Sequence, residues 1–214
     1  VCFFVKEIVY DDDGVPTAML SRREVQEQCR KHYISQLMSG DIIPAKVTHL
    51  EPFGCFVDIG CGIPSLIPID AISVSRISHP SDRFYVGQDI FIAVKGMEKD
   101  RILLTHKELL GTWEENASCF EYGQTVAGIV RSVESYGIFI ELAPNLAGLA
   151  EYRSGISVGQ YASVYIKSII PEKMKIKLII VDVFNGDSIP SEIKYYIKSG
   201  HIDYWRYSSE ESKK

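Results

Sequence analysis

The sequence lacks an excess of positive charge. Its 214 residues include 23 Lys and Arg against 28 Asp and Glu, which gives a formal net charge of −5. This balance excludes a polybasic, histone-like protein that holds nucleic acid mainly by bulk charge. The sequence also lacks any apolar run close to the roughly 18 residues that a membrane-spanning helix needs. We therefore expect no membrane partner, and any binding of nucleic acid must depend on contacts other than net charge.

Signatures of metal sites and of catalysis are also missing. The five cysteines and five histidines are dispersed, without the short paired spacings of zinc sites. No Ser-His-Asp or Cys-His arrangement has a recognisable local signature. The acidic run DDDG at 11–14 lacks the ligand spacing of a calcium loop and is interpreted as a hairpin turn. These absences predict a protein that is not an enzyme and has no cofactor, with buried, reduced cysteines and a cytoplasmic location.

The sequence does contain an internal repeat. Residues 53–59 read FGCFVDI and residues 136–142 read YGIFIEL, and each segment follows a glycine (Gly40 or Gly123) after twelve intervening residues. The two copies are offset by 83 residues, and each later contains the tripeptide Val-Gly-Gln. The first copy has an insertion before this tripeptide, over residues 73–85. A fixed period of this kind predicts two copies of one structural unit.

Signals for the start of a helix recur with nearly the same period. Ser21 precedes Glu24 by three residues, and Thr105 precedes Glu108 by the same spacing. In such a capping box the hydroxyl and the carboxylate each satisfy a backbone amide of the first helical turn. We therefore expect short linker helices over residues 25–39 and 108–122.

The N-terminal stretch matches the second half of a unit. Residues before Ser21 occupy the place that residues 89–104 occupy in the following copy. Residues 1–24 are therefore expected to form the last two strands of a partial unit. The chain starts with Val1 in what looks like the middle of a strand, so it is expected to be a fragment of a longer protein.

Hydrophobic residues alternate within each unit. In the first copy the apolar residues at 55, 57 and 59 share one face, while Phe56 and Asp58 share the other. In the second copy Phe139 and Glu141 take the latter positions. A period of two indicates strands. About five short strands in each unit, with glycine-rich turns, predict a mainly β protein of small closed barrels.

The end of the chain has a different period. Pro190 suits a first helical turn, apolar residues follow at 193, 196 and 197, and Gly200 could end the helix. We therefore expect a C-terminal helical tail over residues 185–214.

The alternation places aromatic rings on the outward face. Phe56 and Phe139 should face water, and each has a second aromatic residue, Phe53 or Tyr136, three positions earlier across a glycine. Bases of single-stranded nucleic acid stack on such rings with about 1–3 kcal/mol per base, largely independently of net charge. A loop or helix could instead cover a single ring. The same pair at the same spacing in both copies favours a binding surface.

These motifs together resemble the S1 RNA-binding domain family. The resemblance rests on the early glycine, the aromatic-Gly-x-Phe segment, Val-Gly-Gln and a closing strand such as RILLT at 101–105. It covers residues 40–107 and 123–181 and implies tandem five-stranded OB-fold barrels. The expected organisation is a partial unit (1–24), a linker helix (25–39), one barrel (40–107), a second linker helix (108–122), a second barrel (123–184) and the helical tail (185–214).

The resemblance also implies an RNA-binding face with two aromatics, a histidine, and an acidic and a basic residue near the last hairpin. Glu98 or Asp100 match the acidic position of the first copy. Pro68 and Glu151 stand where the family has histidine, so each copy loses one polar contact. The expected RNA-binding residues, with neighbouring cations included, are Phe53, Phe56, Lys95, Arg101, Arg131, Tyr136, Phe139, Lys167 and Lys175.

Two functions follow as hypotheses. The first is a tandem module that binds single-stranded RNA, messenger or ribosomal, with a role near the small ribosomal subunit. The second copy is the expected main contact, because residues 117–184 carry six basic and six acidic residues, against seven and eleven in 41–116. The alternative is a scaffold whose barrels bind proteins. It is motivated by the acidic charge, by Pro68 and Glu151, and by the aromatic residues between 195 and 207.

Overall fold

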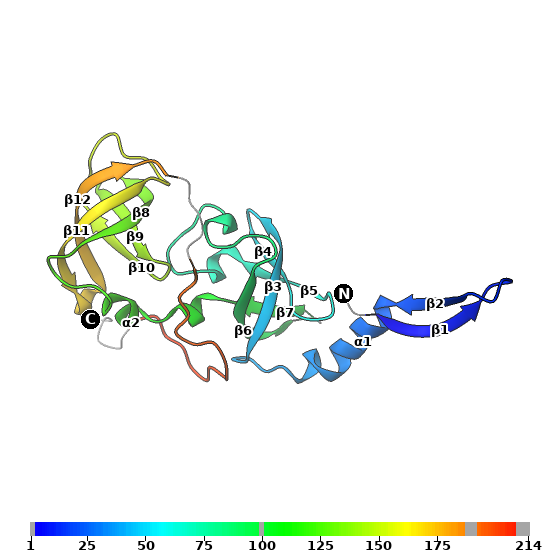
Figure 1. Cartoon of the computed structure of the whole chain (residues 1–214). Helices are drawn as coiled ribbons and strands as arrows, with labels where there is room; N and C mark the ends of the chain where they lie inside the picture. The colour runs from blue at the N-terminus through cyan, green and yellow to red at the C-terminus, as the bar shows by residue number, and fades with distance from the viewer. Residues whose placement is uncertain (1–2, 99–100, 187–191, 209–214) are drawn as a thin grey trace.

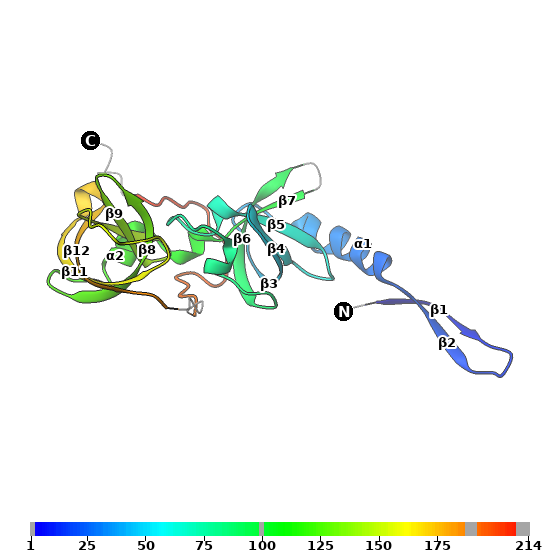
Figure 2. The same cartoon turned by 90° about the horizontal axis from the view of Figure 1, so that it is seen from above.

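The computed structural model describes residues 3–98, 101–186 and 192–208. It contains an N-terminal hairpin and two five-stranded β units that follow one another along an elongated molecule (Figures 1 and 2). The hairpin lies at one end of this arrangement and the second β unit at the other. The prediction of a mainly β fold with tandem barrels is confirmed.

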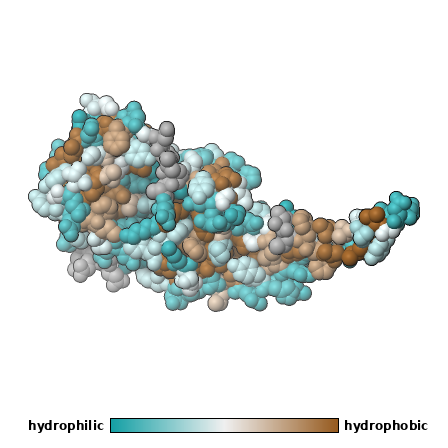
Figure 3. All heavy atoms as spheres, viewed as in Figure 1, coloured by the Kyte–Doolittle hydropathy of each residue, from teal (hydrophilic) through white to brown (hydrophobic). Residues whose placement is uncertain are grey.

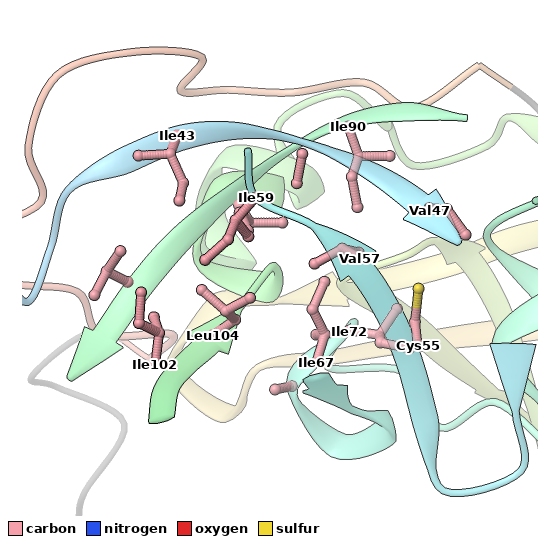
Figure 4. Close-up of a cluster of buried hydrophobic side chains, with 14 of the residues drawn as sticks. Ile43, Val47, Cys55, Val57, Ile59, Ile67, Ile72, Ile90, Ile102 and Leu104 are labelled. Carbon is pink, nitrogen blue, oxygen red and sulfur yellow. The ribbon is translucent and has the colours of Figure 1, made fainter. Parts of the chain in front are cut away.

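The first barrel consists of β3 (Ile42–Glu51), β4 (Gly54–Asp58), β5 (Pro64–Pro68), β6 (Asp89–Glu98) and β7 (Arg101–Thr105), with the 3-10 turns η2 (Ile69–Ala71) and η3 (Pro80–Asp82) between β5 and β6. The strands lie in the antiparallel order β5-β4-β3-β6-β7. Cys55 and Val57 point inward, as the alternation predicts, and meet Ile67, Ile90 and Leu104 in the core (Figure 4). Burial of each large apolar side chain stabilises the fold by about 1.5–3 kcal/mol.

The second barrel repeats this plan with β8 (Thr125–Glu134), β9 (Gly137–Ala143), β10 (Leu146–Ala150), β11 (Tyr161–Ile170), η5 (Pro171–Lys173) and β12 (Lys175–Phe184). It closes completely, because β10 pairs in parallel with β12 at Leu149–Lys177 and Ala150–Leu178. Val130 and Ile140 are among the side chains that fill its interior. The core positions of both copies thus follow from one sequence pattern.

The N-terminal hairpin joins β1 (Phe4–Tyr10) to β2 (Pro16–Ser21). As predicted, the acidic run forms its turn: the Asp11 carboxylate accepts hydrogen bonds from the amides of Asp13 and Val15, and Gly14 adopts a φ of +77°. The apolar residues of these strands are exposed, and the hairpin carries much of the brown surface at its end of the molecule in Figure 3.

The first linker begins where the capping signal predicts. The Ser21 hydroxyl accepts a hydrogen bond from the Glu24 amide and starts helix α1 (Arg22–His32). The helix ends at His32, and the 3-10 turn η1 (Ile34–Gln36) completes the connection to β3. The helix is therefore shorter than the expected 25–39.

The second linker starts later than predicted. Thr105 does contact the Glu108 carboxylate, but only the 3-10 turn η4 (Lys107–Leu110) follows. The α-helix α2 (Trp113–Ala117) is instead capped by Thr112, which exchanges hydrogen bonds with Glu115 in a complete capping box. Gly111, with a φ of +80°, turns the chain between the two short helices.

The prediction of a helical tail is wrong for the described C-terminal residues. Residues 192–208, hereafter the strap, contain no helix, and Pro190 lies outside the described part. Of the residues assigned to one helix face, Ile193 packs against the core of the first barrel. The Tyr195 hydroxyl accepts a hydrogen bond from the Phe91 amide at 3.2 Å, and the Tyr196 amide donates to the Leu109 carbonyl at 2.9 Å. Tertiary contacts therefore override the local helical period.

The strap contacts both barrels. The Ile42 amide, at the start of β3, donates to the Gly200 carbonyl at 3.1 Å. The Tyr207 hydroxyl donates to the Asn145 carbonyl, in the β9–β10 turn, at 2.6 Å. In Figure 1 the strap, coloured orange to red, accordingly runs along both units. The strap therefore connects the two barrels through these hydrogen bonds.

The insertion at 73–85 forms a second connection between the barrels. The Val74 amide donates to the Asn145 side chain at 3.0 Å, and the amide nitrogen of that side chain donates to the Gly111 carbonyl at 2.7 Å. Arg83 then forms a buried ion pair with Glu141 of β9 at 2.5 Å. The insertion thus connects the two barrels through hydrogen bonds and a buried ion pair.

Candidate nucleic-acid interface

The first aromatic pair lies at the start of β4. Phe53 precedes the strand and is 56% exposed, while Phe56 lies on the outward face and is half-buried. Their ring centroids are 6.1 Å apart at an interplanar angle of 89°. This edge-to-face contact holds the rings in place and leaves one face of the more exposed ring for a base.

The second pair repeats this geometry on β9. Tyr136 is 68% exposed and Phe139 is half-buried. Their ring centroids are 6.2 Å apart at 86°. In both barrels the more accessible ring is therefore the one before the strand, whereas the sequence pattern pointed to the phenylalanine within it. We call the two pairs platform 1 (Phe53, Phe56) and platform 2 (Tyr136, Phe139).

Strand register adds residues that the sequence reasoning missed. Phe56 lies opposite His49 of β3 and Leu66 of β5. Phe139 lies opposite Ser132 of β8 and Leu149 of β10. The 83-residue offset relates His49 to Ser132 and Leu66 to Leu149, so the repeat could have indicated these positions once the strands were paired.

The predicted cations are distributed unevenly around the platforms. Lys95, Arg101, Lys167 and Lys175 are all exposed, as a phosphate contact requires. Arg101 lies opposite Glu98, one of the two acidic candidates, in the register of the β6–β7 hairpin. The other candidate, Asp100, lies outside the described residues. Among the described residues, no ion pair or cation–π contact joins Lys95 or Lys175 to an aromatic pair, so their role stays a prediction.

A shallow hollow of about 330 Å³ borders the second barrel's β11–β12 side. It is lined by Lys167, by Leu178–Ile180 of β12, and by the segment that leaves β10, which contributes Glu151, Tyr152 and Arg153. Lys177 lies opposite Leu149, which itself lies opposite Phe139, so the strand register places a further cation two strands away from Phe139. Lys167 and Lys177 thus lie on strands close to platform 2, although the whole chain is acidic.

Arg131 is a correction to the predicted site. Its side chain is 9% exposed and donates from Nε to Glu141 at 2.8 Å and from Nη1 to Asp82 at 3.1 Å. Glu141, which the sequence pattern placed on the water-facing side, is only 5% exposed, and it is the partner of Arg131 in this ion pair. The insertion of the first barrel covers both residues, which a reading of β8 and β9 alone could not show. Arg131 therefore serves the contact between barrels and is removed from the proposed interface.

The described residues contain neither a group of metal-binding side chains nor a membrane-spanning helix. Within them, no three His, Cys, Asp or Glu side chains are grouped so that they could bind a metal ion. No helix in that part of the chain has the length and apolar character to cross a membrane.

Comparison with known proteins gives consistent results. Residues 36–107 match the model of the S1 RNA binding domain. The chain is 30% identical over 207 residues to the small ribosomal subunit protein bS1 of Staphylococcus aureus (strain MRSA252), covering 86% of this chain and 53% of the relative. It is also 30% identical over 207 residues to the small ribosomal subunit protein bS1 homolog of Bacillus subtilis (strain 168), covering 90% and 52%.

The chain thus spans about half the length of these curated relatives. A solved multidomain protein with nucleic acid binding domains from Streptococcus pneumoniae is 16% identical, with 82% of this chain and 59% of that chain covered and a TM-score of 0.31. A TM-score this low adds nothing to the fold described above. The family match and the repeated barrel agree with the resemblance predicted from the sequence, and residues 36–107 match the S1 RNA-binding domain family.

Proposed function

We propose that this chain is a non-catalytic module that binds single-stranded RNA on its two aromatic platforms, in the cytoplasm and in association with the small ribosomal subunit or messenger RNA. The observation that carries the proposal is the recurrence of one aromatic geometry, 6.1 and 6.2 Å between centroids, on equivalent strands of both barrels. The names of the relatives, which are small ribosomal subunit proteins, support the ribosomal setting.

Platform 2 should make the larger contribution. Tyr136 is more exposed than Phe53, the corresponding ring of platform 1. Lys177 lies opposite Leu149, which itself lies opposite Phe139. Base stacking supplies affinity without net positive charge, so an acidic chain can use it. Few phosphates are neutralised, and each adds only about −0.7 to the salt slope for single strands. We expect micromolar affinity with a shallow dependence on salt.

The protein-scaffold alternative loses part of one support. The aromatic residues of the C-terminal segment motivated it, and Tyr204 is 76% exposed, but Tyr195 and Tyr207 contact the barrels and Tyr196 contacts the linker helix α2. These three rings are therefore not free to bind another protein. The proposal of RNA binding does not depend on them.

Tyr136→Ala should weaken the binding of a short fluorescent single-stranded RNA by about 1–3 kcal/mol, which is the contribution of one stacked base. Fluorescence polarisation measures it. Tyr136 is preferable to Phe139 as a target because Phe139 is half-buried, so its removal would also disturb packing. Tyr204→Ala is the matched control, since this tyrosine is at least as exposed as Tyr136 but lies on the strap.

The two variants separate a stacking site from a general effect of losing a ring. Equal affinities of Tyr136→Ala and Tyr204→Ala would remove platform 2 from the site. If the unaltered chain binds no RNA but captures a ribosomal protein after nuclease treatment, the scaffold hypothesis replaces the proposal.

A further inference from the structure

A cluster of reactive side chains forms where the strap crosses α2. Cys119 is an exposed residue just beyond the C-terminal end of α2. The Lys194 ammonium lies 3.3 Å from its sulfur and the Tyr196 hydroxyl 3.5 Å away. Lys194 also lies over the Tyr196 ring, 5.0 Å from the centroid. Two side chains of the strap thus converge on one accessible thiol.

The strap holds this cluster in place. The Tyr196 amide donates to the Leu109 carbonyl at 2.9 Å, and its hydroxyl lies 3.1 Å from the Glu115 carbonyl, to which it can donate. The Tyr196 ring packs so closely on Gly111 that a Cβ there would lie 2.7 Å from Cδ2. The position of the hydroxyl and ammonium donors is therefore set before any reaction at the sulfur.

The surroundings favour an ionised thiol. The hydrogen bond from Tyr196 and the charge and hydrogen bond of Lys194 lower the pKa of Cys119, although partial burial opposes them. The Glu115 carboxylate binds the amide and hydroxyl of Thr112, so it is directed to the helix cap. When the thiol ionises, the Tyr196 hydroxyl can turn from the Glu115 carbonyl to the sulfur. A thiolate of this kind is the nucleophilic form of cysteine.

Two other cysteines of the chain have the opposite environment. Burial raises the pKa of Cys55 to about 12. Burial and the neighbouring Cys61 raise the pKa of Cys29 to about 11. Thiol reactivity depends on thiolate formation and on access. The chain therefore contains its own unreactive controls.

We propose that Cys119 is a thiol-modification site that reacts with low-molecular-weight disulfides, and that its modification detaches the strap from α2. The Cys119 thiolate attacks one sulfur of the disulfide, the new S–S bond forms as the old one breaks, and the second half leaves as a thiolate. Cys119 is oxidised while the disulfide is reduced, so electrons balance within the pair. The sulfur of the mixed disulfide carries no negative charge, so it loses the attraction that holds Lys194 at 3.3 Å and Tyr196 at 3.5 Å.

The rate of reaction with an aromatic disulfide, 5,5′-dithiobis(2-nitrobenzoic acid), tests the site on the folded full chain. Among the four cysteines that the structure describes, we expect Cys119 to be modified first, as located by mass spectrometry of the peptides, and Cys55 last. Lys194→Met should slow the reaction several-fold at pH 7 and move its midpoint to higher pH. Cys61, which is half-buried, is the matched comparison within the same molecule. Modification of Cys119 no faster than Cys61, or an unchanged rate in Lys194→Met, would overturn the site.

Hydrogen exchange tests the effect on the strap. The Tyr196 amide is bonded to Leu109 and should exchange faster once Cys119 carries the aromatic thiol. Cys119→Ser, treated with the same disulfide, is the control for reaction elsewhere. Unchanged exchange in the modified chain would show that the strap stays attached. Neither measurement involves RNA, so its outcome is independent of the proposed function.

Discussion

Glu141→Ala should destabilise the protein by about 3–5 kcal/mol, because it leaves two buried guanidinium groups without their main partner. Glu141 is 5% exposed and accepts from Arg83 at 2.5 Å and from Arg131 at 2.8 Å. Burial already lowers the pKa of Arg83, and the Glu141 carboxylate is the largest opposing influence. Without it, the Asp82–Arg131 contact is the one ion pair that the described residues leave to the two cations. Urea denaturation followed by tryptophan fluorescence measures the loss.

The repeat provides a matched control for this change. Asp58 holds the same position in the first copy, 83 residues earlier, but it is partly exposed and accepts from the amides of Gly60 and Gly62 in its own turn. Asp58→Ala should therefore cost only about 1–2 kcal/mol, the worth of hydrogen bonds to an accessible carboxylate. Equal losses in the two variants would show that the contact between barrels adds little beyond the local turn.

The same pair of residues shows how far sequence reasoning reaches. Alternation within a strand is local, so it correctly placed Cys55 and Val57 inside and put Asp58 and Glu141 on the outer face. What an outer face meets is decided by distant parts of the chain. Glu141 is buried because Arg83 comes from an insertion 58 residues away, and no periodicity in β9 contains that information.

The strap illustrates a second limit. The spacing of Ile193, Tyr196 and Ile197 fits a helix, yet Ile193 packs against the first barrel's core, the Tyr196 amide bonds to Leu109, and Ile197 is exposed. Tyr195 meets Phe91, 104 residues earlier in the chain. The platforms were predictable because both rings of a pair lie three residues apart. Their neighbours His49 and Leu149 required the strand register.

His106 is a buried histidine at the junction of the strap and the first barrel. Its Nδ1 lies 2.8 Å from the Ile72 carbonyl, so it carries the proton there, and Nε2 then accepts from the Tyr195 hydroxyl at 3.1 Å. Phe84 packs edge-on against the ring, with centroids 5.0 Å apart. Burial, assisted by the nearby Arg83 charge, lowers the pKa of His106 to about 4 against the effect of the Ile72 carbonyl.

Stability should therefore fall as the pH drops from 6.5 to about 4, since across this window the unfolded chain takes up a proton that folded His106 does not. The contribution of His106 to the free energy of unfolding is complete above pH 6.5. About 3 kcal/mol of it is lost by about pH 4, and below that pH this group causes no further change. Urea denaturation at several pH values measures it. His106→Asn should lack this pH-dependent contribution, so the difference in unfolding free energy between the variant and the unaltered chain should shrink as the pH falls. Tyr195→Phe keeps the imidazole buried and should retain the slope; parallel curves for His106→Asn and the unaltered chain would contradict the burial argument.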